Sequence, residues 1–341
     1  MLEPWLRTLP GVAQNAIRNG YLAVGTFFVL SGFVLARSYA STPWNSASLI
    51  RYGAGRLARV YPIYLLSLLL ILPFMFEDLV SPGRAALAHA NKTALVADYG
   101  LVLQGWTGAL PVHWNTPAWS LSCELFFYLC FPAVAFLLAG TGWPGMVAAG
   151  VLAMAAPVWY RLTGVTAAWK PVIGIADFLA GIAAAGVYER LLRSRIRLSG
   201  RGFWLSGPAI AAVGAIVAVP GLVNTSVDLN SALRPFSVVM LLGLAFGGGL
   251  PMRALSARLS VFLGKASYSI YILHIPLLWW YKRFWLYTSG VLPLTASAAV
   301  YFTGVVMVSS AAYSLVEEPA NRRIRGWVAA RCASGPRRPA Q

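Results

Sequence analysis

The chain has 341 residues, of which 58% are hydrophobic and only 11% charged, and its mean hydropathy is +0.67. This composition excludes an ordinary soluble domain, and apolar runs near the 18-residue length of a membrane-spanning helix exclude a β-barrel. The net charge of +17 could indicate a nucleic-acid partner, but most of the cations lie in short loops and in the C-terminal segment. In those places basic residues are typical of the cytoplasmic side of a membrane protein and of contact with anionic lipid. We therefore predict an all-α, polytopic bundle in the inner or plasma membrane of the cell, with no nucleic-acid partner.

Nine apolar runs follow one another along the chain, and each is predicted to span the membrane. They cover residues 21–40, 58–76, 118–139, 143–160, 172–189, 203–223, 235–251, 261–281 and 291–316. Placing the loop 40–58 inside gathers most of the 27 Lys and Arg residues on the cytoplasmic side, together with the C-terminus. The predicted organisation is an outside segment 1–20, a transmembrane domain 21–316 and a basic cytoplasmic tail 317–341.

This topology leaves the start of the chain unexplained. Nine spans and an inside C-terminus put the N-terminus outside, yet residues 1–20 have no continuous apolar core of a signal peptide and do not form a span. Three interpretations stay open: a first helix is missing before residue 1, one span is misjudged, or a short tail crosses the membrane unaided.

Polar residues beside the first two runs are the first candidates for a site. Ser31 and Gly32 lie near the inner end of a span, where they suit either close backbone approach in a site or the packing of small residues between helices. Arg56 and Arg59 are three residues apart on one helix face at the cytoplasmic boundary. Guanidinium groups match phosphate oxygens, so this pair is a candidate phosphate site, with a plain membrane anchor as the alternative.

The run 118–139 contains a glutamate, Glu124, and Tyr128 follows four residues later on the same helix face. An ionisable residue inside a span is costly and marks a functional site by default. Glu124 is a candidate general base; alternatively it orients a histidine or pairs with an arginine to hold the bundle together.

The run 261–281 carries Tyr268, Tyr271 and His274, spaced three residues apart and so roughly on one helix face. Polar tips in an apolar helix need partners, and we predict that these residues line a cavity or order the bundle. For His274, the alternative to catalysis is a hydrogen-bonded structural role.

Several common catalytic signatures are absent from the sequence. His89, His113 and His274 show no metal-binding spacing, so no metal site is predicted, and the three cysteines form no CxxC motif or disulfide framework. There is no GxSxG or Walker motif, which removes the usual hydrolase and ATPase classes. No clear internal repeat relates two halves of the chain, which disfavours a secondary transporter.

Taken together, the polar segments resemble the acyltransferase 3 family of integral-membrane acyltransferases. The segments are VxxFFVLSGF at 24–33, RxxRxYPxY at 56–64, WSLxxExxFYxxxP at 119–132, YSIYxxHxP at 268–276 and EEPxxR at 317–322. The resemblance covers nearly the whole chain. It implies a bundle of about ten helices that moves an acyl group, expected to be acetyl, from cytoplasmic acyl-CoA to a hydroxyl of a sugar, cell-envelope glycan or lipid.

The resemblance also implies roles for the candidate residues. Arg56 and Arg59 are expected to bind the CoA phosphates or line the inner mouth, and Glu124 to support a catalytic histidine. The remaining candidates, expected to line or support the cavity, are Ser31, Tyr128, Tyr268, Tyr271 and His274. Residues 77–117 are expected to cap the acceptor side, where His113 reaches the acceptor or lies at the outer interface. Acyl-CoA is then a co-substrate, and no cofactor is expected to stay bound.

Two departures from the family pattern bear on catalysis. Members usually carry an arginine and then a catalytic histidine just before the segment that here begins at Gly20, and this chain has no such histidine. Gly25 stands where the family often has an acidic residue. The alternative to an enzyme is therefore a truncated or degenerate relative that binds glycan or lipid without transfer.

Overall fold

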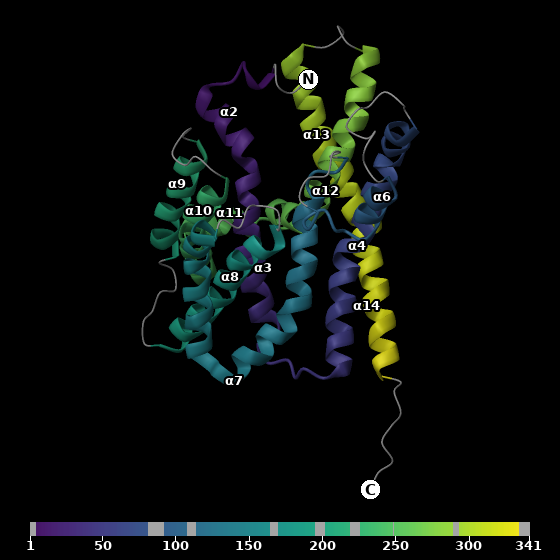
Figure 1. Ribbon diagram of the computed structural model, residues 1–341. Coiled ribbons are helices and arrows are strands. Elements are labelled where there is room, and N and C mark those ends of the chain that lie inside the picture. The colour runs from purple at the N-terminus through teal and green to yellow at the C-terminus, as the bar shows by residue number, and fades with distance from the viewer. Residues whose placement is uncertain are drawn as a thin grey trace.

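The computed structural model describes residues 5–80, 92–107, 114–163, 170–194, 202–218, 226–247, 249–288 and 293–333, and every regular element in these ranges is a helix. A helix satisfies its own backbone hydrogen bonds, as a chain surrounded by hydrocarbon requires. In chain order the helices are α2 (Gly11–Arg18), η1 (Asn19–Leu22), α3 (Ala23–Ser38), α4 (Ser46–Val80), α6 (Lys92–Gly100), α7 (Ala118–Thr163), α8 (Lys170–Arg193), α9 (Gly202–Ala218), α10 (Ser226–Phe246), α11 (Gly249–Leu255), α12 (Arg258–Thr288), α13 (Leu294–Ala312), η2 (Tyr313–Glu317) and α14 (Glu318–Ala333) (Figure 1).

Six helical stretches in the described ranges are long and apolar enough to cross a bilayer. They are Gly11–Ser38, Ser46–Val80, Ala118–Leu138, Lys170–Arg193, Arg258–Phe284 and Thr295–Cys332, and three shorter apolar helices cover Pro144–Ala156, Ser206–Ala215 and Leu233–Phe246. Each of the nine predicted runs overlaps one of these stretches. The protein is thus an all-α, multi-pass membrane protein, and the count of nine spans stays a prediction because three of the helices are short.

The predicted runs 118–139 and 143–160 are joined without a loop between them. They form the two arms of α7, which bends at Gly142, whose φ of 57° and ψ of −136° are not helical. Glycine reaches this region readily because it has no Cβ. The first arm descends to the bend and the second rises from it at the bottom of the molecule (Figure 1).

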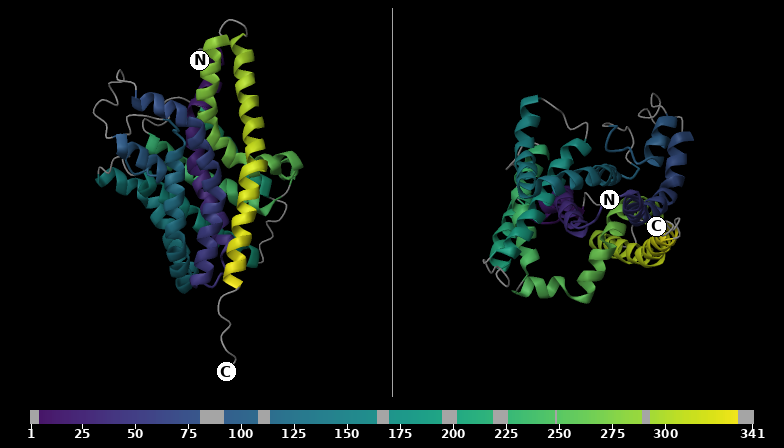
Figure 2. Two further views of the ribbon diagram at one scale, coloured as in Figure 1. Left: turned by 90° about the vertical axis from the view of Figure 1, so that its right-hand side faces the viewer. Right: turned by 90° about the horizontal axis from the view of Figure 1, so that it is seen from below.

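Helical structure extends beyond both ends of the predicted transmembrane domain. At the N-terminal end, α2 and η1 lead directly into α3. At the other end, the α13 helix continues through η2 into α14, and the left view of Figure 2 shows them as one long yellow helix. Since α14 packs against α4, residues 318–333 of the predicted tail form a helix docked on the bundle.

The main group of buried apolar side chains joins α3, α4, α7, α8 and α12. Within it, α3 and α8 touch backbone to backbone: a Cβ added to Gly32 would lie 2.0 Å from the Phe178 carbonyl oxygen, and one added to Gly181 would lie 2.0 Å from that of Val29. Gly32 therefore serves helix packing by small residues, one of the two alternatives left open for this segment.

A buried ion pair ties together α7, α8 and α10. Arg234 Nε donates to Asp177 Oδ1 at 2.5 Å, and Arg234 Nη1 donates to the Ala153 carbonyl at 2.6 Å. The side chains of Arg234 and Asp177 are only 2% and 6% exposed. The motif analysis did not single out either residue, because their partnership exists only after the helices pack.

Candidate active site

A cavity of about 280 Å³ lies between the start of α3, the start of α7 and the middle of α12. Its polar lining brings together residues far apart in the chain, and Glu124 contributes the carboxylate. The lining consists of Gly20, Ala23, Val24, Phe27, Ser120, Leu121, Glu124, Ser267, Tyr268, Tyr271 and Ile272. The sequence-predicted residues Glu124, Tyr268 and Tyr271 therefore share one cavity.

Glu124 is buried, with 6% of its surface exposed, and its partner is the tyrosine one helical turn further on. The Tyr128 hydroxyl donates a hydrogen bond to Glu124 Oε1. The positive charges of Arg59 and Arg56 on α4 act on this carboxylate. The spacing of the two residues on one helix face predicted their proximity, and the structure adds that Glu124 faces a cavity.

Arg56 lies outside this cavity, within a cage of aromatic rings. Its Cζ atom is 5.6 Å from the ring centre of Tyr128, 5.8 Å from that of Tyr39 and 6.0 Å from that of Tyr52. The Tyr52 hydroxyl donates to the Tyr128 carbonyl at 3.0 Å and so fixes one wall of the cage. Cation–π contacts of this kind hold Arg56 against the Tyr128 ring, outside the cavity that Glu124 lines. Arg59 is likewise absent from the cavity lining.

The three polar residues of α12 have different partners. Tyr268 lines the cavity while its hydroxyl donates to the Val60 carbonyl at 2.7 Å. The Tyr271 hydroxyl accepts from Ser120 Oγ at 3.0 Å and lies 3.5 Å from the Pro117 carbonyl oxygen. His274 Nδ1 donates to the Tyr271 carbonyl at 2.6 Å. His274 is outside the cavity lining, and its contacts are those of a residue that orders the bundle.

Ser120 is a cavity residue that the sequence analysis did not select, although it stands within the WSLxxE segment that carries Glu124. Ser31, by contrast, is not among the residues that line this cavity. His113 falls outside the described residues, as do the rest of 108–113 and residues 81–91 of the predicted cap. In the described part of the predicted cap, Trp114 Nε1 donates to Asp78 Oδ2 at 2.8 Å and so holds the end of that segment to α4.

A family model described as "Acyltransferase domain" matches residues 3–314. The chain belongs to the acyltransferase 3 family. It is thus a membrane acyltransferase that transfers groups other than aminoacyl groups, as the sequence motifs predicted.

Two curated proteins illustrate the similarity. "Acyltransferase MdmB" of Streptomyces mycarofaciens is 26% identical over an alignment that covers 89% of this chain and 81% of the relative. "Protein 2 in picA locus" of Rhizobium radiobacter is 35% identical over 123 residues, which cover 31% of this chain and 62% of the relative. No solved structure matches the chain.

The cavity of this membrane acyltransferase has the chemical groups that acyl transfer needs. A carboxylate can accept a proton, hydroxyl groups can donate to a developing oxyanion, and apolar walls keep these interactions strong by excluding water. In the lining, Glu124 has the carboxylate, Ser120 and Tyr271 have hydroxyl groups, and side chains such as Phe27 and Ile272 form the apolar wall.

Proposed function

We propose that this membrane acyltransferase moves an acyl group, acetyl in the simplest case, from acyl-CoA to a hydroxyl of a sugar, cell-envelope glycan or lipid. The observation that carries the proposal is the buried Glu124 carboxylate lining a cavity together with Tyr268 and Tyr271. Family membership supports the reaction class. The choice of an oxygen acceptor rests on chemistry, because a hydroxyl needs a base at the reacting atom.

In the proposed reaction, the acceptor oxygen attacks the carbonyl carbon of the thioester. The new C–O bond forms as the C–S bond breaks, and the hydroxyl proton passes to Glu124 and then to the departing thiolate to give free CoA. Of the described residues that line the cavity, Glu124 is the one with a carboxyl group, a side chain that can serve as a general base. The base role is therefore assigned to Glu124.

Negative charge develops on the carbonyl oxygen as the acceptor attacks, and a hydroxyl donor is the natural stabiliser. Tyr268 is already committed, since its hydroxyl donates to Val60 at 2.7 Å. Tyr271 is more available, because its acceptor at Pro117 lies at 3.5 Å, the weak limit of a hydrogen bond. Tyr271 is thus assigned to the oxyanion, with Ser120 orienting its hydroxyl.

The substitution Glu124→Gln tests the base. It keeps the size of the side chain and the acceptor oxygen for Tyr128 but removes the proton acceptor, so we expect transfer from radiolabelled acetyl-CoA to fall about a hundredfold or more. The measurement is the rate of CoA release by membranes supplied with glycan and lipid acceptors. The control is Glu189→Gln, which alters the exposed Glu189 that pairs with Arg37 at 3.2 Å, far from the cavity in the fold.

Each result has a definite meaning. Full activity of Glu124→Gln would remove Glu124 from the chemistry. If the unaltered protein binds acyl-CoA but releases no CoA with any acceptor, the chain is instead a non-catalytic relative, the alternative raised by the absent histidine.

A further inference from the structure

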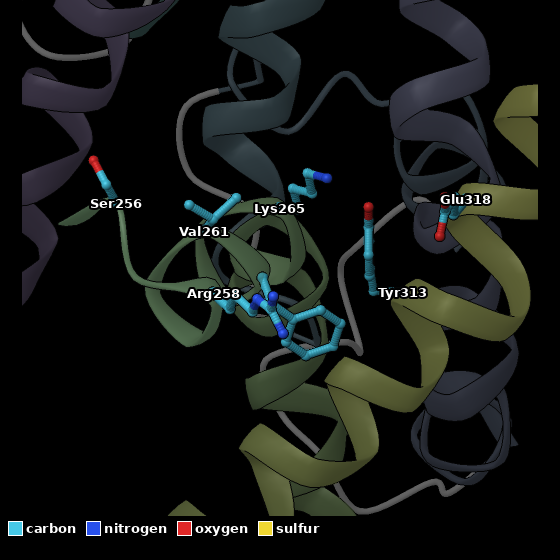
Figure 3. Close-up of a pocket in the computed structure, with 7 residues that line it drawn as sticks. Ser256, Arg258, Val261, Lys265, Tyr313 and Glu318 are labelled. Atoms are coloured by element: carbon cyan, nitrogen blue, oxygen red, sulfur yellow. The ribbon is translucent and has the colours of Figure 1, made fainter. Parts of the chain in front are cut away.

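A second cavity, of about 420 Å³, lies beside the first, between the start of α12 and the junction of α13 with α14. Five of its seven lining side chains are polar or charged. The lining consists of Ser256, Arg258, Val261, Phe262, Lys265, Tyr313 and Glu318. Figure 3 shows the Lys265 amine and the Tyr313 hydroxyl directed into the space between α12 and the α13–α14 junction, with Arg258 at its edge. None of these lining residues is among the candidate site residues predicted from the sequence.

Cationic side chains outnumber carboxylates in the lining of this second cavity. Arg258 and Lys265 contribute two cations, against one carboxylate from Glu318. At Tyr313 the charges of Glu318 and Glu317 act most strongly, and those of Arg59 and Arg322 act after them. A cavity that combines a guanidinium, an ammonium and two hydroxyl groups matches the oxygens of a phosphate.

The second cavity lies where two helices change from basic to apolar. α13 contains no charged residue, whereas α14 carries Arg322, Arg323, Arg325 and Arg331. α12 begins with Arg258 and Lys265 and then runs through the apolar stretch 266–281. Such a change marks the boundary between water and membrane, on the side where basic residues gather.

The same helix links the two cavities. Lys265 lines the second cavity, and Ser267, Tyr268 and Tyr271 line the one that contains Glu124. At 1.5 Å per residue, Lys265 and Tyr268 are about 5 Å apart along the axis of α12, and Arg258 and Tyr271 about 20 Å. An extended pantetheine arm is of the right order to join a phosphate near Arg258 to a thioester beside Glu124.

We propose that the second cavity binds phosphate, and that this phosphate belongs to the 3′-phospho-ADP part of the coenzyme A donor. The assignment to the donor rests on the function proposed above. Arg258 and Lys265 hold the phosphate at the water boundary while the acyl arm follows α12 into the membrane. The charges of Arg56 and Arg59 then act on the Glu124 carboxylate. Phosphate binding is thus assigned to Arg258 and Lys265 and no longer to the Arg56–Arg59 pair that the sequence motifs indicated.

The test compares three ligands on purified protein in nanodiscs of phosphatidylcholine, with isothermal titration calorimetry as the readout. We expect Kd to rise from CoA to 3′-dephospho-CoA to pantetheine, because each step removes phosphate. In Arg258→Gln/Lys265→Gln, Kd for CoA should rise at least tenfold, since charge-assisted hydrogen bonds are lost, while Kd for pantetheine stays unchanged. Arg253→Gln, at an exposed arginine of α11 outside the lining, is the matched control and should bind CoA normally.

Two further variants make the outcome decisive. Lys265→Arg keeps the charge and should retain CoA binding, and Glu318→Gln removes the opposing carboxylate and should tighten it several-fold. The proposal is overturned if the double variant binds CoA as the unaltered protein does, or if it loses pantetheine equally. Neither result would contradict the proposed function, which fails only if the unaltered protein transfers no acyl group.

A lipid headgroup offers the same phosphate chemistry, and a second titration distinguishes the two sources. Phosphatidylglycerol added to the nanodiscs should leave Kd for CoA unchanged if the donor is the natural occupant. A rise in Kd that disappears in the double variant would support the phosphate site but assign it to lipid. If neither CoA nor phosphatidylglycerol distinguishes the double variant from the unaltered protein, there is no phosphate site here.

Discussion

At the scale of single residues, the protein buries two carboxylates in different ways. Asp177 is bonded directly by the Arg234 guanidinium, which in turn reaches the Ala153 carbonyl. Glu124 is bonded by a phenol, and in the described part of the chain no cation lies within ion-pair distance of it. A carboxylate fully paired with a cation is suited to holding helices together. One that faces a cavity and keeps an oxygen available is suited to proton transfer.

The pairing of Asp177 predicts a large loss of stability on substitution. Asp177→Asn leaves the Arg234 charge buried without its partner, which costs about 3 to 5 kcal/mol. The measurement is the thermal unfolding of purified protein in detergent. The control is Glu189→Gln, which breaks the exposed pair with Arg37 and should cost no more than about 1 kcal/mol. Equal effects of the two substitutions would contradict a structural role for the buried pair.

At the scale of elements, the contact between α3 and α8 fixes one wall of the cavity. α3 carries Val24 and Phe27 of the lining, and the same helix rests on α8 through Gly32 and Gly181. Glycines at both contact points let the two backbones meet, which is how helices associate closely in a membrane. The position of the cavity wall therefore depends on residues that lie outside the cavity.

Gly181→Ala tests this dependence. Its new Cβ would lie 2.0 Å from the Val29 carbonyl oxygen, so the helices must separate, at a cost of about 1 to 3 kcal/mol or more, and transfer should slow as the wall moves. Gly304→Ala in α13 is the matched control, because its Cβ would meet nothing within 4 Å. That change should leave transfer intact and stabilise the helix by about 0.5 to 1 kcal/mol. Unchanged stability of Gly181→Ala would refute the close contact.

At the scale of the whole molecule, several ends of helices meet on one side. The end of α3, the start of α4, the end of α8 and the end of α14 all lie at the bottom of Figure 1. Basic residues accompany them, among them Arg37, Arg51, Arg193 and Arg331. The fold thus gathers at one end many of the cations that the predicted topology places in the cytoplasm. The start of α12, which lines the second cavity, lies part-way up the bundle, where the basic helix α14 joins the apolar α13.

The predicted orientation places Cys332 near the end of α14 on the cytoplasmic side. In Cys123→Ser/Cys130→Ser, Cys332 is the remaining thiol of the three in the chain. A membrane-impermeant maleimide should label it in inverted membrane vesicles and leave it unlabelled in intact cells, because positive segments stay inside. Cys332→Ser in the same background is the blank. Labelling in intact cells alone would reverse the topology.

The sequence by itself determined the class of the protein, most of the helical stretches and the family, because hydropathy and motif order are local properties of the chain. It also indicated that Glu124 and Tyr128 share a helix face, since a four-residue spacing fixes that. It did not determine which candidates share a site: Arg56 and His274 lie outside the cavity, and Ser120 lies within it.

Only the tertiary structure decided those placements, because a cavity exists between helices and depends on how closely they approach. The two glycines between α3 and α8, and the partnership of Arg234 with Asp177, 57 residues away, leave no periodic signal in the sequence. The same is true of the second cavity, where Lys265 and Tyr313 come together only because α12 packs against the α13–α14 helix. Local patterns specify helices, and side-chain packing between them specifies the site.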